Sequence, residues 1–218
     1  GPGTLVPKAI RWIAAETDAR VERIVVKPGA RVEADTIILE LSNPVVQDQL
    51  AAARAEFVAA EASYVARESE LESQLLDQRA NYAAVQAEYE GARLQAEAEG
   101  ELASKGIIPR IQFQRSQLAA ESLKVRLEIE GDRMAKSRQN IGKQLEAERA
   151  RIDQLARTRD LRQRQADALQ LRAGIAGVLQ QVPVEEGQQV MAGSNLARVA
   201  RPDVLMAELR IAETQAKD

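Results

Sequence analysis

The sequence predicts an α+β protein in which a long antiparallel α-helical hairpin is inserted into a split β-sandwich. A β-type stretch near the N-terminus recurs near the C-terminus, and the residues between the two copies read as two long helical segments. The composition agrees, because 45% of the 218 residues are hydrophobic, many of them alanine, and only 3% are aromatic. Such a composition favours closely packed helices over a bulky globular core.

Residues 9–42 form the first half of the predicted sandwich. From residue 19 to residue 41 the sequence reads ARVERIVVKPGARVEADTIILEL, in which β-branched and polar residues alternate as in half-buried strands. Gly29 interrupts the pattern where a tight turn requires a positive φ angle. The pattern stops at Leu41, after too few strands to close a core.

The second half lies 158 residues further along the chain, in residues 171–201. Residues 177–199 read GVLQQVPVEEGQQVMAGSNLARV, so that Gly29 corresponds to Gly187. The other matched pairs include Val21 and Leu179, Ile24 and Val182, Val26 and Val184, Val32 and Val190, Ile38 and Leu196, and Leu41 and Val199. Because neither half can bury its apolar face alone, we expect the two halves to pack as a pseudo-twofold sandwich.

Residues 43–170 are predicted to form the inserted hairpin, with helices over 44–104 and 109–170. Large apolar residues recur at sevens in both segments, with one four-residue step from Leu71 to Leu75. This spacing is typical of a coiled coil with a stutter. At 1.5 Å per residue, each arm of such a hairpin is roughly 90 Å long.

Local signals mark the ends of the predicted helices. Ser42 or Asn43 suits the N-cap of the first helix, and Pro44 suits its first turn. Residues 103–110 read ASKGIIPR, in which Gly106 suits the left-handed residue that ends a helix. A turn of a few residues between two long helices predicts an antiparallel hairpin.

The two helical segments contain 61 and 62 residues, so the hairpin returns to the place where the two β halves must meet. With the turn centred near residue 106, residues whose numbers sum to about 213 are expected to face each other. Three helical glycines then lie opposite large side chains: Gly100 near Phe113, Gly131 near Tyr82, and Gly142 near Leu71.

The two ends of the chain carry short alternating segments. Residues 1–8 and 202–218 are predicted as truncated β-barrel stubs, because they need both termini to form a further β domain. The chain begins Gly-Pro-Gly without methionine, from which we expect a signal or anchor to have been removed. Trp12, the only tryptophan, is expected to pack against the β domain as an anchor.

The composition excludes several classes of function. The chain has no Cys and no His, which removes thiol chemistry, imidazole catalysis and nearly every zinc or copper site, so we expect neither a metal nor a cofactor. A net charge of −3 gives no reason to expect nucleic acid. The carboxylates Glu68, Glu70 and Glu72 lie beside Arg67 and read as a solvated helix face, and no catalytic motif accompanies them.

The duplicated pattern V..I.V..G..V.A[DG][TS].[IL]..[LV] resembles the two halves of a biotinyl-lipoyl domain. In lipoyl carriers the modified lysine lies on the hairpin that joins the halves. Here Ser42 and Asn43 occupy that position, and no lysine occurs between Lys27 and Lys105, so a carrier role is disfavoured. The whole layout, a split lipoyl-like domain with an inserted helical hairpin, resembles the HlyD-like periplasmic adaptor, or membrane fusion, proteins of efflux pumps and type I secretion systems.

The resemblance implies a structural role in transport without catalysis. Such adaptors lie in the periplasm, anchored at the inner membrane, and assemble, commonly as hexamers, into a tube. The tube links an inner-membrane transporter, which the long hairpin weakly indicates to be ABC-type, to an outer-membrane channel of the TolC type. A coiled-coil spacer or tether is the alternative, but it has no need to bring both chain ends together. Acids of the first arm and arginines late in the second are expected to pair, within a hairpin or between neighbours.

The resemblance also implies two sets of site residues. The hairpin tip, residues 102–110, would dock on the channel through Leu102, Ser104, Lys105, Gly106, Ile107, Ile108 and Pro109. Of the tip signature found in many such adaptors only Leu102 is kept, since Ala98 and Pro109 stand at the arginine and serine positions. The mode of docking and the channel itself therefore stay open, and simple closure of the turn is an equal explanation for the isoleucines. Gln188 and Gln189 would line the ring, or else lie in a solvated loop.

Overall fold

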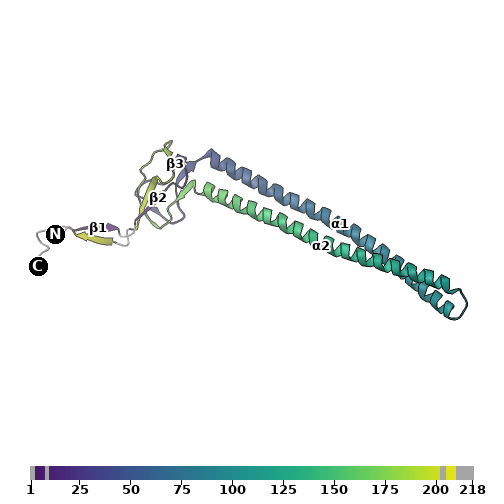
Figure 1. Ribbon diagram of the computed structural model, residues 1–218. Helices are drawn as coiled ribbons and strands as arrows, with labels where there is room; N and C mark the ends of the chain where they lie inside the picture. Colours follow the sequence, from purple (N-terminus) through teal and green to yellow (C-terminus); the bar gives the residue numbers. More distant parts are fainter. Residues whose placement is uncertain (1–2, 8–9, 202–204, 210–218) are drawn as a thin grey trace, which may run out of the picture. The chain divides into compact units, whose positions relative to one another are not determined.

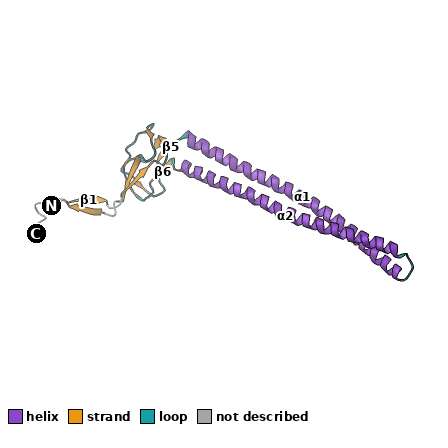
Figure 2. Cartoon of the chain, in the orientation of Figure 1, coloured by secondary structure: helices purple, strands orange, loops and turns teal. Residues whose placement is uncertain are grey.

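The computed structural model describes residues 3–7, 10–201 and 205–209 of the chain. The chain divides into two compact units, Gly1–Glu56 with Ala156–Asp218, and Phe57–Leu155 (Figures 1 and 2). The first unit holds the β-sheets and the second is built from two antiparallel helices. The predicted α+β fold class is confirmed.

The β-sheets of the first unit reproduce the sequence repeat. One sheet has the strand order β2-β9-β7-β4, and the other has the order β6-β5-β3-β8. Adding 158 to the residue numbers carries β2 onto β6, β3 onto β7, β4 onto β8 and β5 onto β9, so that the repeat converts one sheet into the other. The strands are β2 Ile10–Ala14, β3 Ala19–Ile24, β4 Arg31–Val32, β5 Ile37–Ser42, β6 Gln170–Arg172, β7 Gly177–Gln181, β8 Gln189–Val190 and β9 Asn195–Ala200.

Hydrogen bonds at the turns obey the same symmetry. The amide of Gly29 donates to the carbonyl of Leu179 (2.7 Å), and the amide of Gly187 donates to the carbonyl of Val21 (2.8 Å). Both glycines have positive φ, 95° and 87°, as the turns require. Each half therefore completes the hydrogen bonding of the other, and the expected pseudo-twofold arrangement is present.

The core of this unit is assembled from both halves of the chain. Its fully buried side chains include Ile38 and Leu39 from the first half and Leu179 and Leu196 from the second. Burying each such side chain contributes about 1.5–3 kcal/mol. Neither half could reach this burial alone, which explains why the chain keeps both copies of the repeat.

Helix α1 spans Pro44–Ser104 and helix α2 spans Arg110–Asp167. The side chain of Asn43 caps α1, because its Oδ1 accepts a hydrogen bond from the amide of Val46 (3.2 Å). Helix α2 begins one residue later and ends three residues earlier than the predicted 109–170. The earlier end has a tertiary cause, since Gln170–Arg172 leave the helix to pair with β5.

In the Phe57–Leu155 unit, the partly buried positions of each helix recur in steps of three and four, as in a coiled coil. The predicted stutter at Leu71 and Leu75 is present, and α2 carries a second stutter at Ile141 and Leu145. Leu71 is only 2% exposed, the deepest burial in this part of the chain.

Two of the three predicted glycine contacts are confirmed. A Cβ on Gly100 would lie 3.0 Å from the Phe113 ring, and one on Gly131 would lie 3.5 Å from the Tyr82 ring. The prediction for Gly142 was wrong, because a Cβ there would meet no atom within 4 Å. Because of the second stutter, Ile141 lies in the buried seam of α2. Gly142, the next residue, lies about 100° further round the helix, on its exposed face.

At the chain ends, β1 Gly3–Pro7 pairs with β10 Leu205–Leu209 as an antiparallel two-stranded sheet. The other residues of the predicted barrel stubs lie outside the described residues, so the assignment of both stubs to a barrel stays a prediction. Trp12 packs against the guanidinium of Arg198, its partner on β9, at 5.5 Å from the ring centroid. The side chain therefore contacts the β domain, as expected, while it remains 46% exposed.

Candidate partner-docking surface at the hairpin tip

The turn between α1 and α2 is a closed, hydrogen-bonded structure. Gly106 has a φ of 73°, its amide donates to the carbonyl of Ala103 (3.1 Å), and the amide of Ile107 donates to the carbonyl of Leu102 (3.0 Å). These two bonds form the Schellman motif that ends a helix at a left-handed glycine. The hydroxyl of Ser104 donates to the carbonyl of Glu101 (2.7 Å), which satisfies another terminal carbonyl.

Most of the tip residues predicted from the sequence are exposed on this turn. Lys105, Ile107 and Pro109 are exposed, whereas Ile108 is half-buried. Ile107 is 65% exposed, although a large apolar side chain gains from burial. The structure thus places the tip residues together and holds the isoleucine outward on an ordered backbone.

Sequence reasoning missed one apolar residue of the tip. Ile111, in the first turn of α2, is 57% exposed and joins Leu102 and Ile107 as an exposed large hydrophobic residue of this region. The exposure of Ile111 could have been predicted, because this residue lies two positions before Phe113 and therefore outside the buried seam of the coiled coil. We call Leu102, Ile107 and Ile111 the tip apolar set.

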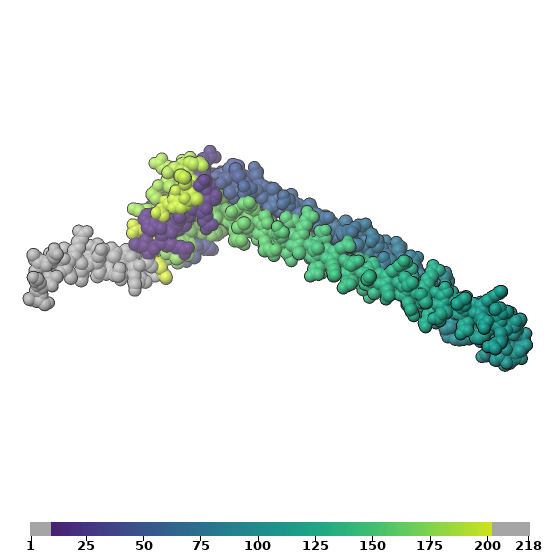
Figure 3. Space-filling model, in the orientation of Figure 1, coloured from purple at the N-terminus to yellow at the C-terminus, as the bar shows by residue number. Residues whose placement is uncertain are grey.

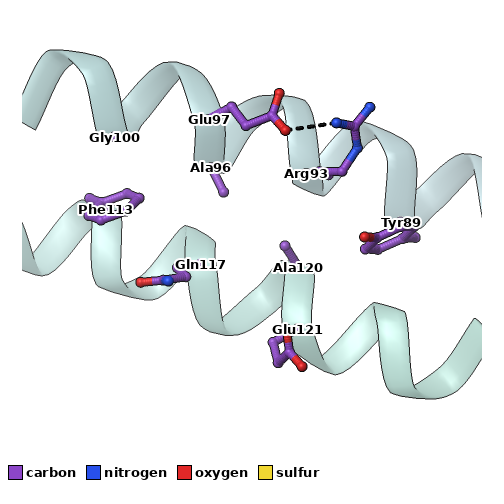
Figure 4. Close-up of a pocket in the computed structure, with 9 residues that line it drawn as sticks. All are labelled: Tyr89, Arg93, Ala96, Glu97, Gly100, Phe113, Gln117, Ala120 and Glu121. Carbon is purple, nitrogen blue, oxygen red and sulfur yellow. Dashed lines mark hydrogen bonds and ion pairs between the residues drawn. The ribbon is translucent and has the colours of Figure 1, made fainter.

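Below the turn, a groove of about 400 Å³ opens between the two helices (Figure 4). Its base is formed by small residues, because Ala96, Gly100 and Ala120 stand where a coiled coil usually has large ones. Arg93 and Glu97 form an ion pair of 2.7 Å at its rim. The residues lining the groove are Tyr89, Arg93, Ala96, Glu97, Gly100, Phe113, Gln117, Ala120 and Glu121.

Across the hairpin from this groove, Glu99 joins the two helices. Its Oε1 accepts hydrogen bonds from Gln95 in α1 (3.0 Å) and from Gln112 in α2 (3.4 Å). Hydrogen bonds from Gln95, Ser116 and Gln112 hold the pKa of Glu99 below its ordinary value, because they favour the charged form. An ionised Glu99 therefore links the last turns of α1 to the first turns of α2.

The second predicted site, the loop at Gln188 and Gln189, is exposed. The side chain of Gln188 is engaged within its own turn, since its Oε1 accepts a hydrogen bond from the amide of Glu185 (2.9 Å). Gln189 belongs to β8 and pairs with Arg20 of β3. Of the two glutamines, Gln189 is the one whose side chain has no such role in shaping the loop.

Other kinds of site find little support in the described part of the chain. No group of three or more carboxylate, imidazole or thiol side chains is placed to hold a metal ion there. Among the described helices, none has an apolar stretch long enough to cross a membrane. At the junction where a carrier would hold its lysine, Asn43 instead caps α1 and donates from Nδ2 to the carbonyl of Asp18 (2.6 Å).

Comparison with known families decides the assignment. Residues 10–200 match the model of the CusB barrel-sandwich hybrid domain. The chain belongs to this family. It is accordingly one of the membrane fusion, or periplasmic adaptor, proteins, as the resemblance in sequence indicated. A comparison with curated proteins found no match.

Solved structures show the same fold at low sequence identity. The structure of the periplasmic adaptor protein EmrA aligns with 97% of this chain and 78% of its own length, at 14% identity and a TM-score of 0.51. That of MacA from Actinobacillus actinomycetemcomitans aligns with 97% of this chain, at 13% identity and a TM-score of 0.52. This chain covers 55% of the MacA chain, so it spans about half of that adaptor.

Proposed function

We propose that this adaptor acts in the periplasm, where it assembles as a ring or tube and bridges an inner-membrane transporter to an outer-membrane channel without catalysing a reaction. An ABC-type transporter, a channel of the TolC type and six copies per ring are the partners and stoichiometry that the family resemblance implies. The single observation that carries the proposal is the tip apolar set, exposed on an ordered turn at the end of a long helical hairpin.

The tip has the physical properties of a docking surface. Its backbone is fixed by the Schellman hydrogen bonds, so binding would not have to order a flexible loop. Burying one exposed isoleucine or leucine is worth about 1.5–3 kcal/mol. A few such side chains are enough to dominate an interface.

Gln189 is proposed to line the channel of the assembled ring, because it is an exposed polar residue on a short strand of the β domain. Gln188 is proposed to hold the shape of the same loop through its bond to Glu185. Replacing Gln189 with alanine should change the rate of export but not the melting temperature. If Gln189→Ala leaves export unchanged, the residue is a solvated surface position.

The docking role is tested by substituting Ile107 with aspartate in cells whose export depends on this protein. We expect at least a tenfold loss of export, since a charge would be buried at the interface. Gln114→Asp is the matched control, because Gln114 is also exposed on the first turns of α2. The helical content and melting temperature of both variants should stay near those of the unchanged chain.

Undiminished export by the Ile107→Asp chain would contradict docking through the tip apolar set. A passive spacer, the alternative function, predicts that outcome. Equal losses in the Ile107→Asp and Gln114→Asp chains would point instead to a general effect of charge at the end of the hairpin.

A further inference from the structure

Helix α1 carries a second apolar line that its own hairpin does not use. From Val58 to Ala98, exposed positions spaced three or four residues apart read V-A-V-S-S-L-A-A-A-G-L-A, without a charged residue among them. Val58, Val65, Leu76 and Leu94 are each more than half exposed. We call this line the α1 outer seam; it repeats like a coiled-coil seam and includes the same stutter as the buried one.

Helix α2 carries a complementary line near the tip. Ile111, Leu118, Val125 and Ile129 are exposed large hydrophobic residues at spacings of seven, seven and four. Leu118 is 73% exposed, the largest value among the large hydrophobic residues described. We call these four residues the α2 outer stripe; they lie on the face of α2 that is turned away from the buried seam. Figure 3 draws the two helices in space-filling form.

The side chains of the α1 outer seam and of the α2 outer stripe are complementary in size at equal distances from the turn. The contacts of Gly100 with Phe113 and of Gly131 with Tyr82 set α1 and α2 in antiparallel register, which places Leu94 level with Leu118. At this level the α1 outer seam is mostly Ala and Gly, whereas the α2 outer stripe has large side chains. Small residues on one helix admit the large residues of another, as in knobs-into-holes packing.

The charges of the two helices match as well. Helix α1 has twelve Asp and Glu against four Arg, a net charge of −8, and α2 has fourteen Lys and Arg against nine Asp and Glu, a net charge of +5. Within residues 57–155, the ion pair that joins the two helices is Arg126 with Glu88 (3.3 Å), while the others lie within one helix. Arg149 contacts the hydroxyl of Tyr64 (2.8 Å) instead of a carboxylate. Most of the net negative charge of α1 and the net positive charge of α2 is therefore available to a neighbouring chain.

We propose that the α1 outer seam binds the α2 outer stripe of a second copy of this chain. Each chain offers both surfaces, so the contact is head-to-tail and leaves one seam and one stripe free. Repetition of such a contact forms a ring when the rotation between copies closes, as the proposed ring requires. The inference rests on the self-assembly stated under Proposed function and names the surface through which it occurs. The charge difference between α1 and α2 selects the α1–α2 contact over α1–α1 and α2–α2 contacts.

The absence of cysteine from the chain permits a direct test by disulfide trapping. Two differently tagged chains, one with Leu94→Cys and the other with Leu118→Cys, are mixed at the highest attainable concentration and oxidised gently. We expect mixed-tag dimers in at least several-fold excess over a control in which Gln95→Cys replaces Leu94→Cys. Gln95 is exposed and adjacent in sequence, but it lies about 100° round the helix from the seam.

Equal yields from the Leu94 and Gln95 variants would overturn the proposal, as would the absence of any mixed dimer. Trapping of Leu94→Cys chains with one another at the same yield would show a symmetrical contact and would also overturn it. A second measurement avoids disulfide chemistry: Leu118→Glu should lower self-association by at least tenfold in light scattering. Ala119→Glu, at an exposed position about 100° round the helix from the stripe, should not. Neither measurement involves a transporter or channel, so failure here and failure of the export test are distinguishable.

Discussion

At the scale of single residues, glycine serves several different physical purposes in this chain. Gly29 and Gly187 supply the positive φ angles of two symmetry-related turns. Gly177 is needed for space, because a Cβ there would lie 2.5 Å from the carbonyl oxygen of Ala200. Gly142 has neither constraint, since it is helical and nothing lies within 4 Å of its added Cβ. The structure therefore predicts that substitution by alanine lowers the stability at Gly177 and raises it at Gly142.

Gly177→Ala should destabilise the β domain by at least about 1–3 kcal/mol, the usual cost of overpacking. Gly142→Ala should stabilise the hairpin by roughly 0.5–1 kcal/mol, because alanine is the better helix former. Chemical denaturation followed by circular dichroism measures both changes. Equal and small effects at the two positions would show that the backbone at Gly177 can move away from Ala200.

Glu99 is expected to titrate below the ordinary range of a glutamate. Its folded pKa is lowered, so its stabilising effect is present above the unfolded pKa and is lost as the pH falls through the folded pKa. Nuclear magnetic resonance titration of the Glu99 carboxyl should give this lowered midpoint. Gln95→Ala, which removes the first-named hydrogen bond, should move the midpoint upward, and no movement would show that this bond does not cause the shift.

At the scale of secondary-structure elements, the stutter at Leu71 and Leu75 decides which leucines of α1 are buried. Leucines only a few residues apart therefore differ widely in exposure. Leu71 is 2% exposed in the seam, whereas Leu76, five residues later, is 62% exposed. Leu71→Ala should cost about 2–5 kcal/mol of hairpin stability through lost burial and a residual cavity. Leu76→Ala should change it by less than about 0.5 kcal/mol. Thermal unfolding of the two variants compares them, and a larger loss for Leu76 would mean that the seam is wrongly placed.

How far the elements could be predicted depended on whether their causes were local. The start of α1 at Pro44, its end beside Gly106 and the stutter at Leu71 all have local signals, and all were predicted. The end of α2 at Asp167 depends on pairing with β5, a contact that no local signal announces. The same limit explains the error at Gly142, because a second stutter in the facing helix decides which residues enter the seam.

The candidate site was predicted less completely than the fold. Family resemblance indicated the tip, and the structure places Ile107 outward on a fixed turn there. It did not indicate Ile111, whose exposure follows from its position on the coiled coil. Nor could the sequence show that Gln188 is held by Glu185, since that bond depends on the shape of the loop.

At the scale of the whole molecule, the β domain is closed by two chain segments that the hairpin separates. Strand β5 ends at Ser42 and lies antiparallel to β6, where Glu40 faces Gln170. The two strands could therefore be joined directly by a tight turn, without the helices. The hairpin is then an insertion into a domain that is complete in itself.

Replacing residues 43–167 by Asn-Gly should give a folded β domain, because β5 and β6 remain paired and most of the core remains. Loss of Val46 from the core should lower its stability relative to the intact chain. Dispersed amide resonances with slow exchange in β3, β5, β7 and β9 would confirm this. An unfolded product would show that the helix ends are required to close the core.

The proposed bridging function is tested most directly by photo-crosslinking in living cells, with a photoreactive amino acid at position 107. Docking through the tip apolar set predicts adducts with an outer-membrane channel protein. The same probe at position 114, also exposed on the hairpin, should give far fewer. Adducts from position 107 that contain no outer-membrane protein, or equal labelling from both positions, would contradict docking through the tip.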